Sequence, residues 1–274
     1  MFEEILSNVR SKAPLVHAIT NYVTVNDCAN MLLACGASPI MADDAAEVEE
    51  ITTICAALVL NIGTLNARTI QSMFLAGRKA AQLTHPVVLD PVGAGASPLR
   101  TGTALQIMRD VRPSVLRGNI SEVKAVANAG SSTQGVDAAA ADRVTEDNLD
   151  QAVAFAQGFS RQTGAVVAVT GAIDIVADGS KAYVIRNGTA LMSRVTGTGC
   201  MLSCVIGAFC AANPGRLTEA TAAAVAAMGL CGELAHHKLQ QADGGTATYR
   251  TLIIDCMSKL DGAALAGGAK VESR

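Results

Sequence analysis

Apolar and polar positions divide the chain into two kinds of segment that alternate along it. Short runs dominated by Val, Ile, Leu and Ala are typical of buried strands, whereas longer stretches with apolar residues every three or four positions are typical of amphipathic helices. The pattern predicts strands at 56–61, 86–90, 114–117 and 165–170, and a hairpin of 173–177 with 181–186. It predicts helices at 25–35, 65–83, 102–110, 120–128, 146–163, 199–212, 218–240 and 247–261.

This alternation of strands and helices predicts the fold class. Parallel strands need a crossover connection, usually a helix, so we expect an α/β domain in which helices flank a largely parallel central sheet. No linker rich in Pro, Gly or Ser divides residues 1–274, and no repeat of fixed period is found, so we expect a single domain. Within it we expect a flexible loop at 129–141 and a frayed tail at 262–274.

The composition narrows the class of partner. The chain has 274 residues with a formal net charge of −3, no Trp, three Tyr and five Phe. A nucleic-acid-binding surface needs basic patches and stacking rings, so this balance argues against nucleic acid and favours small-molecule ligands. Only 16% of the residues are charged, against a typical value of about 25%, so we expect contacts between subunits to cover part of the apolar excess.

Neither membrane insertion nor export is expected from the sequence. No uninterrupted apolar stretch approaches the roughly 20 residues of a membrane helix, and the polar start MFEEILSNVR lacks a signal-peptide core. The eight cysteines form no Cys-x-x-Cys pair, which indicates neither a zinc site nor a disulfide framework. We therefore expect a cytoplasmic protein without a membrane partner, in which most cysteines are small core residues.

A glycine turn at residues 195–200 carries the strongest chemical signal. Its sequence, Val-Thr-Gly-Thr-Gly-Cys, precedes an apolar helical run, so the amides of Gly197, Thr198 and Gly199 can form a phosphate cradle at a helix N-terminus. Cys200 lies just inside that helix, where the helix dipole lowers the pKa of a thiol. The turn lacks the third glycine of a dinucleotide fingerprint and the Lys of a P-loop. It therefore predicts a reactive thiol beside an anion site.

A second glycine cluster, at 86–96, adds a carboxylate to the predicted site. Asp90 ends a short apolar run there and precedes Gly93 and Gly95. An Asp at the carboxyl end of a strand faces the ligand crevice of an open α/β sheet, where it can hold Mg²⁺ that bridges phosphate oxygens. Polar residues also end other predicted strands, namely Asn61, Arg117 and Thr170. Together these positions indicate nucleotide phosphoryl transfer.

Six segments together resemble the hydroxyethylthiazole kinase family, whose fold is ribokinase-like. They are 14–21, 36–41, 60–65, 89–96, 117–119 and 196–200. The most specific of these positions is Cys200, where relatives with the same fold usually carry Asp. The resemblance implies ATP-dependent phosphorylation of the hydroxyethyl group of 4-methyl-5-(2-hydroxyethyl)thiazole, a salvage step toward thiamine.

The same resemblance implies roles for individual residues. Asn21, Met41 and Gly197 would bind the thiazole, Arg117 and Thr170 would bind ATP, and Asp90 and Glu122 would lie around the metal and phosphates. The resemblance also implies a homotrimer with active sites between subunits. Asn21 and Met41 of one chain would then face Cys200 of a neighbour.

Several alternatives stay open at this point. Met41 could fill the core and Glu122 could stabilise the first turn of its helix. Cys200 could accept the substrate proton or only orient the hydroxyl. Two positions depart from the family: Ala172 stands where Glu is usual, and Gly244-Gly245-Thr246 follows Asp243 in place of Gly-Pro-Gly-Ser/Thr.

Three other functions compete with the resemblance. Two are enzymes of the same fold, a hydroxymethylpyrimidine kinase and an ADP-dependent hydrate dehydratase, and both usually carry Asp at the place of Cys200. The third is a nucleotide-binding regulator without turnover. The presence of both Asp90 and Cys200 argues against such a regulator.

Overall fold

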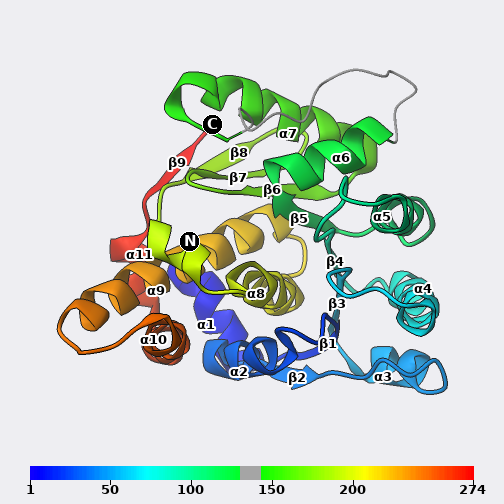
Figure 1. The fold of residues 1–274 in the computed structure, drawn as a ribbon, viewed down its shortest axis with the longest axis horizontal. Coiled ribbons are helices and arrows are strands. Elements are labelled where there is room, and N and C mark those ends of the chain that lie inside the picture. The colour runs from blue at the N-terminus through cyan, green and yellow to red at the C-terminus, as the bar shows by residue number, and fades with distance from the viewer. Residues whose placement is uncertain (130–142) are drawn as a thin grey trace.

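A computed structural model describes residues 1–129 and 143–274. Within these residues one sheet of nine strands crosses the molecule in the order β2-β1-β3-β4-β5-β6-β7-β8-β9 (Figure 1). The strands are β1 (Leu15–Ile19), β2 (Ser38–Ile40), β3 (Ala57–Asn61), β4 (Val87–Asp90), β5 (Val115–Asn119), β6 (Val166–Thr170), β7 (Asp174–Ala177), β8 (Ala182–Ile185) and β9 (Val271–Ser273).

The sheet is parallel from β2 to β6 and antiparallel from β7 to β9. Its register places Asn61 of β3 opposite Asp90 of β4, and Asn119 of β5 opposite Thr170 of β6. The carboxyl ends of the six parallel strands β1 to β6 therefore meet at one edge, which is where ligands bind in open α/β sheets.

Helices cover both faces of the sheet and enclose two apolar cores (Figure 1). On one face α1, α2, α8, α9 and α10 pack together, and on the other α3 to α7 pack together. The helices are α1 (Phe2–Lys12), α2 (Val25–Cys35), α3 (Val48–Ile54), α4 (Ala67–Gln82), α5 (Pro98–Asp110), α6 (Ile120–Ala129), η1 (Glu146–Asn148), α7 (Leu149–Thr163), η2 (Ala190–Arg194), α8 (Thr198–Ala212), α9 (Leu217–Gln240), α10 (Thr246–Lys259) and α11 (Gly262–Gly268).

The predicted strands and helices are all present, and local chemistry explains their ends. Gly36 ends α2 in the left-handed conformation at a φ of 97°. Asn66 opens α4 with a capping box. α5 begins at Pro98, four residues before its predicted start, because Ser97 caps it and proline suits the first helical position. The predicted single α/β domain with helices on both sides of a mostly parallel sheet is confirmed.

The ends of the chain differ from the prediction. The tail at 262–274 was expected to fray, but it forms α11 and then β9, which pairs antiparallel with β8. Asp261 caps α11 by accepting a hydrogen bond from Ala264 N at 2.7 Å, and these ordered contacts tie the tail to the sheet. The pattern also missed α1, β1, β2 and α3. Most of the loop expected at 129–141 lies outside the described residues.

α9 is long and apolar enough to cross a membrane by length and composition alone. However, 78% of its most apolar window is buried inside the protein, where it packs in the same core as α8 and α10. α9 therefore has the position of a core helix.

Candidate active site

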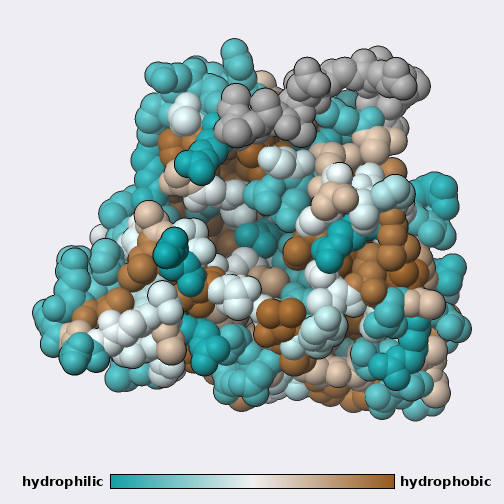
Figure 2. Space-filling model, in the orientation of Figure 1, coloured by the Kyte–Doolittle hydropathy of each residue, from teal (hydrophilic) through white to brown (hydrophobic). Residues whose placement is uncertain are grey.

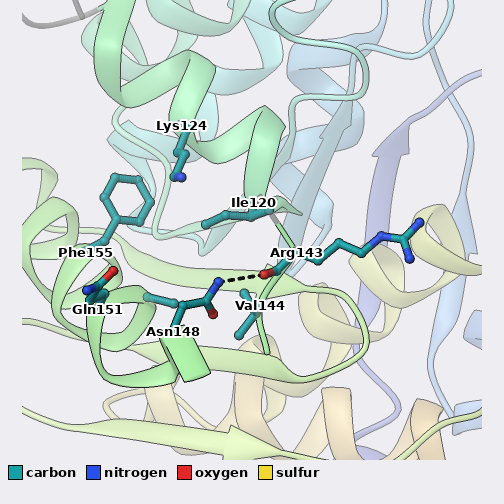
Figure 3. A pocket seen from close by; sticks show the side chains of 8 residues that line it. Ile120, Lys124, Arg143, Val144, Asn148, Gln151 and Phe155 are labelled. Carbon is teal, nitrogen blue, oxygen red and sulfur yellow. Dashed lines mark hydrogen bonds between the residues drawn. The ribbon is translucent and has the colours of Figure 1, made fainter. Parts of the chain in front are cut away.

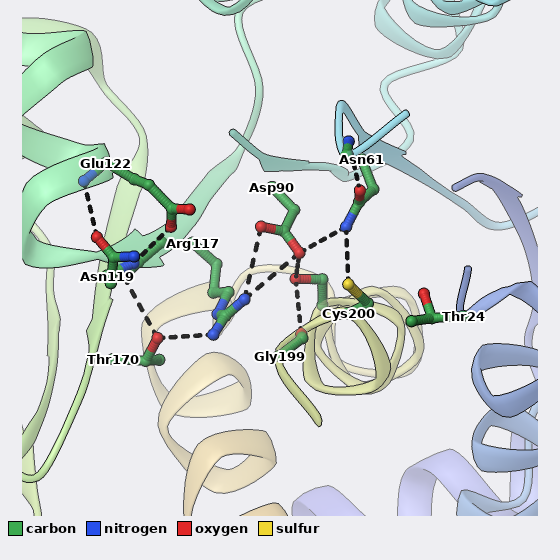
Figure 4. Close-up of polar contacts among 12 residues, drawn as sticks. Thr24, Asn61, Asp90, Arg117, Asn119, Glu122, Thr170, Gly199 and Cys200 are labelled. Atoms are coloured by element: carbon green, nitrogen blue, oxygen red, sulfur yellow. Dashed lines mark hydrogen bonds and ion pairs between the residues drawn. The ribbon is translucent and has the colours of Figure 1, made fainter. Parts of the chain in front are cut away.

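Most of the predicted site residues converge where the carboxyl ends of the strands meet the start of α8. Figure 4 shows Asp90, Arg117, Thr170 and Cys200 gathered over this edge of the sheet, each on a different strand or helix. Residues as far apart in the sequence as Asp90 and Cys200 thus belong to one polar cluster.

The glycine turn before α8 has the predicted conformation at Gly197 but not at Gly199. Gly197 is the N-cap of α8 and has a φ of 87°, and a side chain there would also lie 2.5 Å from Thr24 Cγ2. Gly199 differs from the prediction, because it is helical and has no positive φ. A Cβ at Gly199 would lie 2.5 Å from Arg117 Nη1, so a side chain there would displace the Arg117 guanidinium. The first intrahelical bond of α8 runs from Met201 N to Gly197 O, so the preceding amides can face an anion.

Asp90 is fully buried at the end of β4. Its Oδ2 accepts hydrogen bonds from Asn61 Nδ2 and Ser203 Oγ, both at 2.8 Å, and Arg117 Nη1 lies 3.4 Å away. Burial raises the pKa of the Asp90 carboxyl above its ordinary value, although Arg117 and these two donors act to lower it. The contacts satisfy the carboxylate form and hold it in one orientation.

Cys200 is partly buried, unlike the other seven cysteines, which are all buried and free. Its Sγ accepts hydrogen bonds from Asn21 Nδ2 at 3.2 Å and from Asn61 Nδ2 at 3.3 Å. The predicted low thiol pKa is wrong: burial and then the charge of Asp90 raise the pKa of Cys200. Desolvation and a neighbouring carboxylate outweigh the dipole of the helix.

Arg117 connects the carboxylate to the far side of the cluster. Its Nη2 donates to Thr170 Oγ1 at 2.7 Å, while its Nη1 approaches Asp90. Its Nε is buried without a hydrogen-bond partner within the described part of the chain. A buried, unsatisfied donor on a guanidinium is suited to an incoming phosphate oxygen.

Glu122 has a structural role that the sequence left open. It forms a capping box at the start of α6, in which its N–H donates to Asn119 Oδ1 at 2.8 Å and its Oε2 accepts from Asn119 N at 2.9 Å. Its Oε1 accepts from Gly93 N at 2.9 Å, so it also holds the glycine loop that follows Asp90.

Asn21 lies differently from the expectation, whereas nothing within one chain tests the expectation for Met41. Asn21 contacts Cys200 within the same chain, so it does not lie across a subunit boundary from that thiol. Met41 follows β2 and packs, partly buried, against the core of the α8 face. β2 lies three strands from β4 in the sheet, a distance of roughly 14 Å at about 4.8 Å per strand.

Ser203 and Asp174 were not singled out from the sequence. Ser203 follows Cys200 by three residues, so it lies on the same side of α8, and this spacing could have indicated it. Asp174 accepts from Gly171 N at 2.8 Å in the turn after Thr170. His17 is buried between Thr52 Oγ1 and the carbonyl of Ala42, at 2.9 and 2.8 Å, in a structural position.

A cavity of about 240 Å³ lies between α6, η1 and α7 (Figure 3). It is lined by Ile120, Lys124, Arg143, Val144, Asn148, Gln151, Ala152 and Phe155. It contains none of the residues predicted for the site, so the polar cluster at α8 is a separate feature.

Comparison with protein families matches residues 6–262 to one described as the hydroxyethylthiazole kinase family. The hydroxyethylthiazole kinase of Clostridium acetobutylicum is 58% identical over 273 residues, which cover 100% of both chains. The hydroxyethylthiazole kinase of Desulfovibrio desulfuricans is 51% identical over 278 residues, which cover 99% of this chain and 98% of that protein.

Comparison with solved structures gives matches of the same kind. The structure of the hydroxyethylthiazole kinase protein from Pyrococcus horikoshii OT3 matches with a TM-score of 0.87 at 36% identity, covering 100% of this chain and 98% of that one. A ribokinase-like superfamily protein from Enterococcus faecalis matches at 14% identity with a TM-score of 0.59, covering 94% and 89% of the two chains. The second likeness concerns the fold alone, and the predicted ribokinase-like fold is confirmed.

Proposed function

This chain belongs to the hydroxyethylthiazole kinase family, and from that premise we propose how its residues perform the reaction. The enzyme is a kinase that transfers the γ-phosphoryl group of ATP to the hydroxyethyl group of 4-methyl-5-(2-hydroxyethyl)thiazole. The product is the thiazole phosphate used in thiamine salvage. The observation that carries the assignment is the meeting of Asp90, Arg117 and Cys200 at the N-terminus of α8.

In the proposed reaction the substrate hydroxyl attacks the γ-phosphorus in line, and the bond to the β-phosphate oxygen breaks. Arg117, held by Thr170, and the amides of residues 197–200 neutralise charge on the transferred oxygens. Cys200 orients the hydroxyl and gives modest base assistance, because a loose transition state needs little early deprotonation. The raised pKa of Cys200 supports orientation as its main role. Asn21, Met41 and Gly197 bind the thiazole.

The residues also fit Mg²⁺ that is bound mainly through phosphate. Mg²⁺ usually takes one or two protein carboxylates together with substrate phosphates and water. Among residues 1–129 and 143–274 no three His, Cys, Asp or Glu side chains gather as a metal cage. Asp90 and Glu122 would hold the ion, since each carboxylate retains free acceptor capacity. When bound, it would neutralise phosphate charge.

The experiment is turnover of ATP with the thiazole alcohol, without it, and with hydroxymethylpyrimidine in its place. We expect phosphoryl transfer only to the thiazole alcohol. Transfer to the pyrimidine alone would identify a hydroxymethylpyrimidine kinase, and ADP-dependent repair of a hydrate would identify a dehydratase. Binding of ATP without any turnover would identify a regulator.

We expect a cytoplasmic homotrimer, in which Met41 of one chain completes the thiazole pocket at Cys200 of its neighbour. Directly after Asn21, Tyr22 is 78% exposed and Val23 is 58% exposed. Figure 2 shows apolar side chains, in brown, reaching the surface around the hollow of this face. Apolar surface beside a site is typical of a subunit contact.

Complementation between inactive variants tests this arrangement. Met41→Arg subunits are mixed with Asp90→Asn/Cys200→Ala subunits after dissociation, so that some interfaces combine an intact Met41 with an intact Cys200. We expect part of the activity to return. A preparation shown to contain mixed trimers, but with no more activity than the unmixed variants together, would place the complete site within one chain.

A further inference from the structure

Asn61 touches both Asp90 and Cys200. Its Nδ2 donates to Asp90 Oδ2 at 2.8 Å and to Cys200 Sγ at 3.3 Å (Figure 4). β3 and β4 are parallel neighbours in which Asn61 is paired with Asp90, so the register of the sheet puts the amide beside the carboxylate. α8 brings the thiol to the same amide. One side chain therefore links a strand end to a helix start.

The orientation of the Asn61 amide is fixed by donors. Its Oδ1 accepts from the backbone N–H of Gly63 at 2.9 Å and from Asn21 Nδ2 at 3.0 Å. The Oδ1 of Asn21 in turn accepts from the backbone N–H of Thr24 at 3.1 Å. A backbone N–H can only donate a hydrogen bond. If either side-chain amide flipped by 180°, its NH₂ group would therefore face a backbone N–H and both groups would be left unsatisfied. Both Nδ2 groups are thereby aimed at the Cys200 sulfur.

We propose that Asn61 is a positioning residue for phosphoryl transfer, which sets the placement of Cys200 relative to Asp90 and holds the sulfur as a hydrogen-bond acceptor. This inference rests on the proposed function, since it concerns the same reaction. Asn61 is buried, and within residues 1–129 and 143–274 its side chain hydrogen-bonds the reacting cluster through these two residues and Asn21. Its removal should therefore affect the chemical step more than substrate binding.

Two substitutions test the proposal. Asn61→Asp keeps the shape but replaces both N–H donors with a carboxylate, and we expect kcat to fall about 10²-fold with each KM within about threefold. Asn61→Ala removes the donors without adding charge, and we expect kcat to fall about tenfold. In a Cys200→Ala background, Asn61→Ala should cost at most about threefold, because the two residues act through one contact.

A second readout does not depend on turnover. Cys200 is the one cysteine of the eight that is not buried, so iodoacetamide should label it first in the folded protein. At one fixed pH, Asn61→Asp should slow this labelling at least about tenfold, because a carboxylate near the sulfur disfavours the thiolate. If the parent does not phosphorylate the thiazole, the proposed function fails while the labelling still tests Asn61.

Asn213→Asp is the matched control. Asn213 is also buried and donates to the carbonyls of Ile5 and Phe209, but it follows the opposite end of α8, roughly 20 Å from Cys200. It should lose stability without changing kcat or the labelling rate. Two results in folded Asn61 variants would overturn the proposal. One is an unchanged labelling rate together with effects of Asn61→Ala and Cys200→Ala on kcat that are fully additive. The other is a loss of activity that comes from a higher KM alone.

Discussion

The charge of Arg117 acts to lower the pKa of both Asp90 and Asp174, but the two carboxyl groups differ in how many hydrogen bonds they accept. Asp90 is fully buried and receives hydrogen bonds from two side chains besides its contact with Arg117. Asp174, at the start of β7, is partly buried and accepts from the backbone N–H of Gly171. Burial raises the pKa of both carboxyls, and that of Asp174 reaches about 7.

The difference lies in how many donors hold each carboxyl group. Asp90 accepts hydrogen bonds from Asn61 and Ser203, which favour its charged form, so its place in the cluster is set by hydrogen bonding as well as by charge. Asp174 has fewer donors and changes protonation near neutral pH. Asp174 also provides a carboxylate close to Ala172, the position where the resemblance to the family leads us to expect Glu.

Asp90→Asn should have the largest effect. The amide keeps the shape but removes the charge and presents an N–H₂ group to donors, so we expect kcat/KM to fall about 10²- to 10³-fold with the fold intact. Steady-state kinetics at limiting and saturating Mg²⁺ and a thermal unfolding curve measure this. If the variant equals the parent at limiting Mg²⁺, the metal role of Asp90 is wrong.

Substitution of Cys200 should have a smaller effect. Cys200→Ala should reduce kcat about 10²-fold or less if the thiol only orients the hydroxyl, against up to about 10⁴-fold for an essential base. Cys200→Asp should remain active, because Asn21 and Asn61 already aim two donors at this position. If Cys200→Asp is folded but inactive, that reasoning is wrong. If Cys200→Ala is as active as the parent, Cys200 has no part in the mechanism.

Asp174→Asn should have the smallest effect, one that depends on pH. The folded protein keeps the Asp174 proton up to about pH 7, whereas the unfolded chain releases it near pH 4, so this group stabilises the fold fully at low pH. That contribution is lost as the pH rises from about 4 to 7. The loss is less than about 1.4 kcal/mol per pH unit, because solvent reaches part of the side chain.

Thermal unfolding of parent and variant from pH 5 to pH 8 measures the effect of Asp174. The parent should lose stability relative to Asp174→Asn as the pH rises across this range. Asp178→Asn is the control, because the Asp178 carboxyl already has a pKa lowered to about 2 and does not titrate there. Parallel curves for parent and Asp174→Asn would show that Asp174 is ionised throughout.

Much of the fold and part of the site follow from local sequence. The apolar runs at β3 to β6 and the turn residues 178–180 predicted a mostly parallel sheet with a closing hairpin, because burial on a sheet leaves a strong apolar signal. The short β2 and β9, with three residues each, leave no such signal and were missed. Their pairing depends on neighbouring strands that are distant in sequence.

The sequence by itself determined the glycine turn before α8, the Asp at the end of β4 and the family, because these depend on residue type and local spacing. Only the tertiary structure decided the protonation and direction of these groups. Cys200 gains a raised pKa because folding buries it near Asp90, and it becomes an acceptor because Asn21, in the loop after β1, and Asn61, at the end of β3, converge on it. Desolvation and hydrogen-bond direction arise from contacts across more than a hundred residues of chain, which no local pattern encodes.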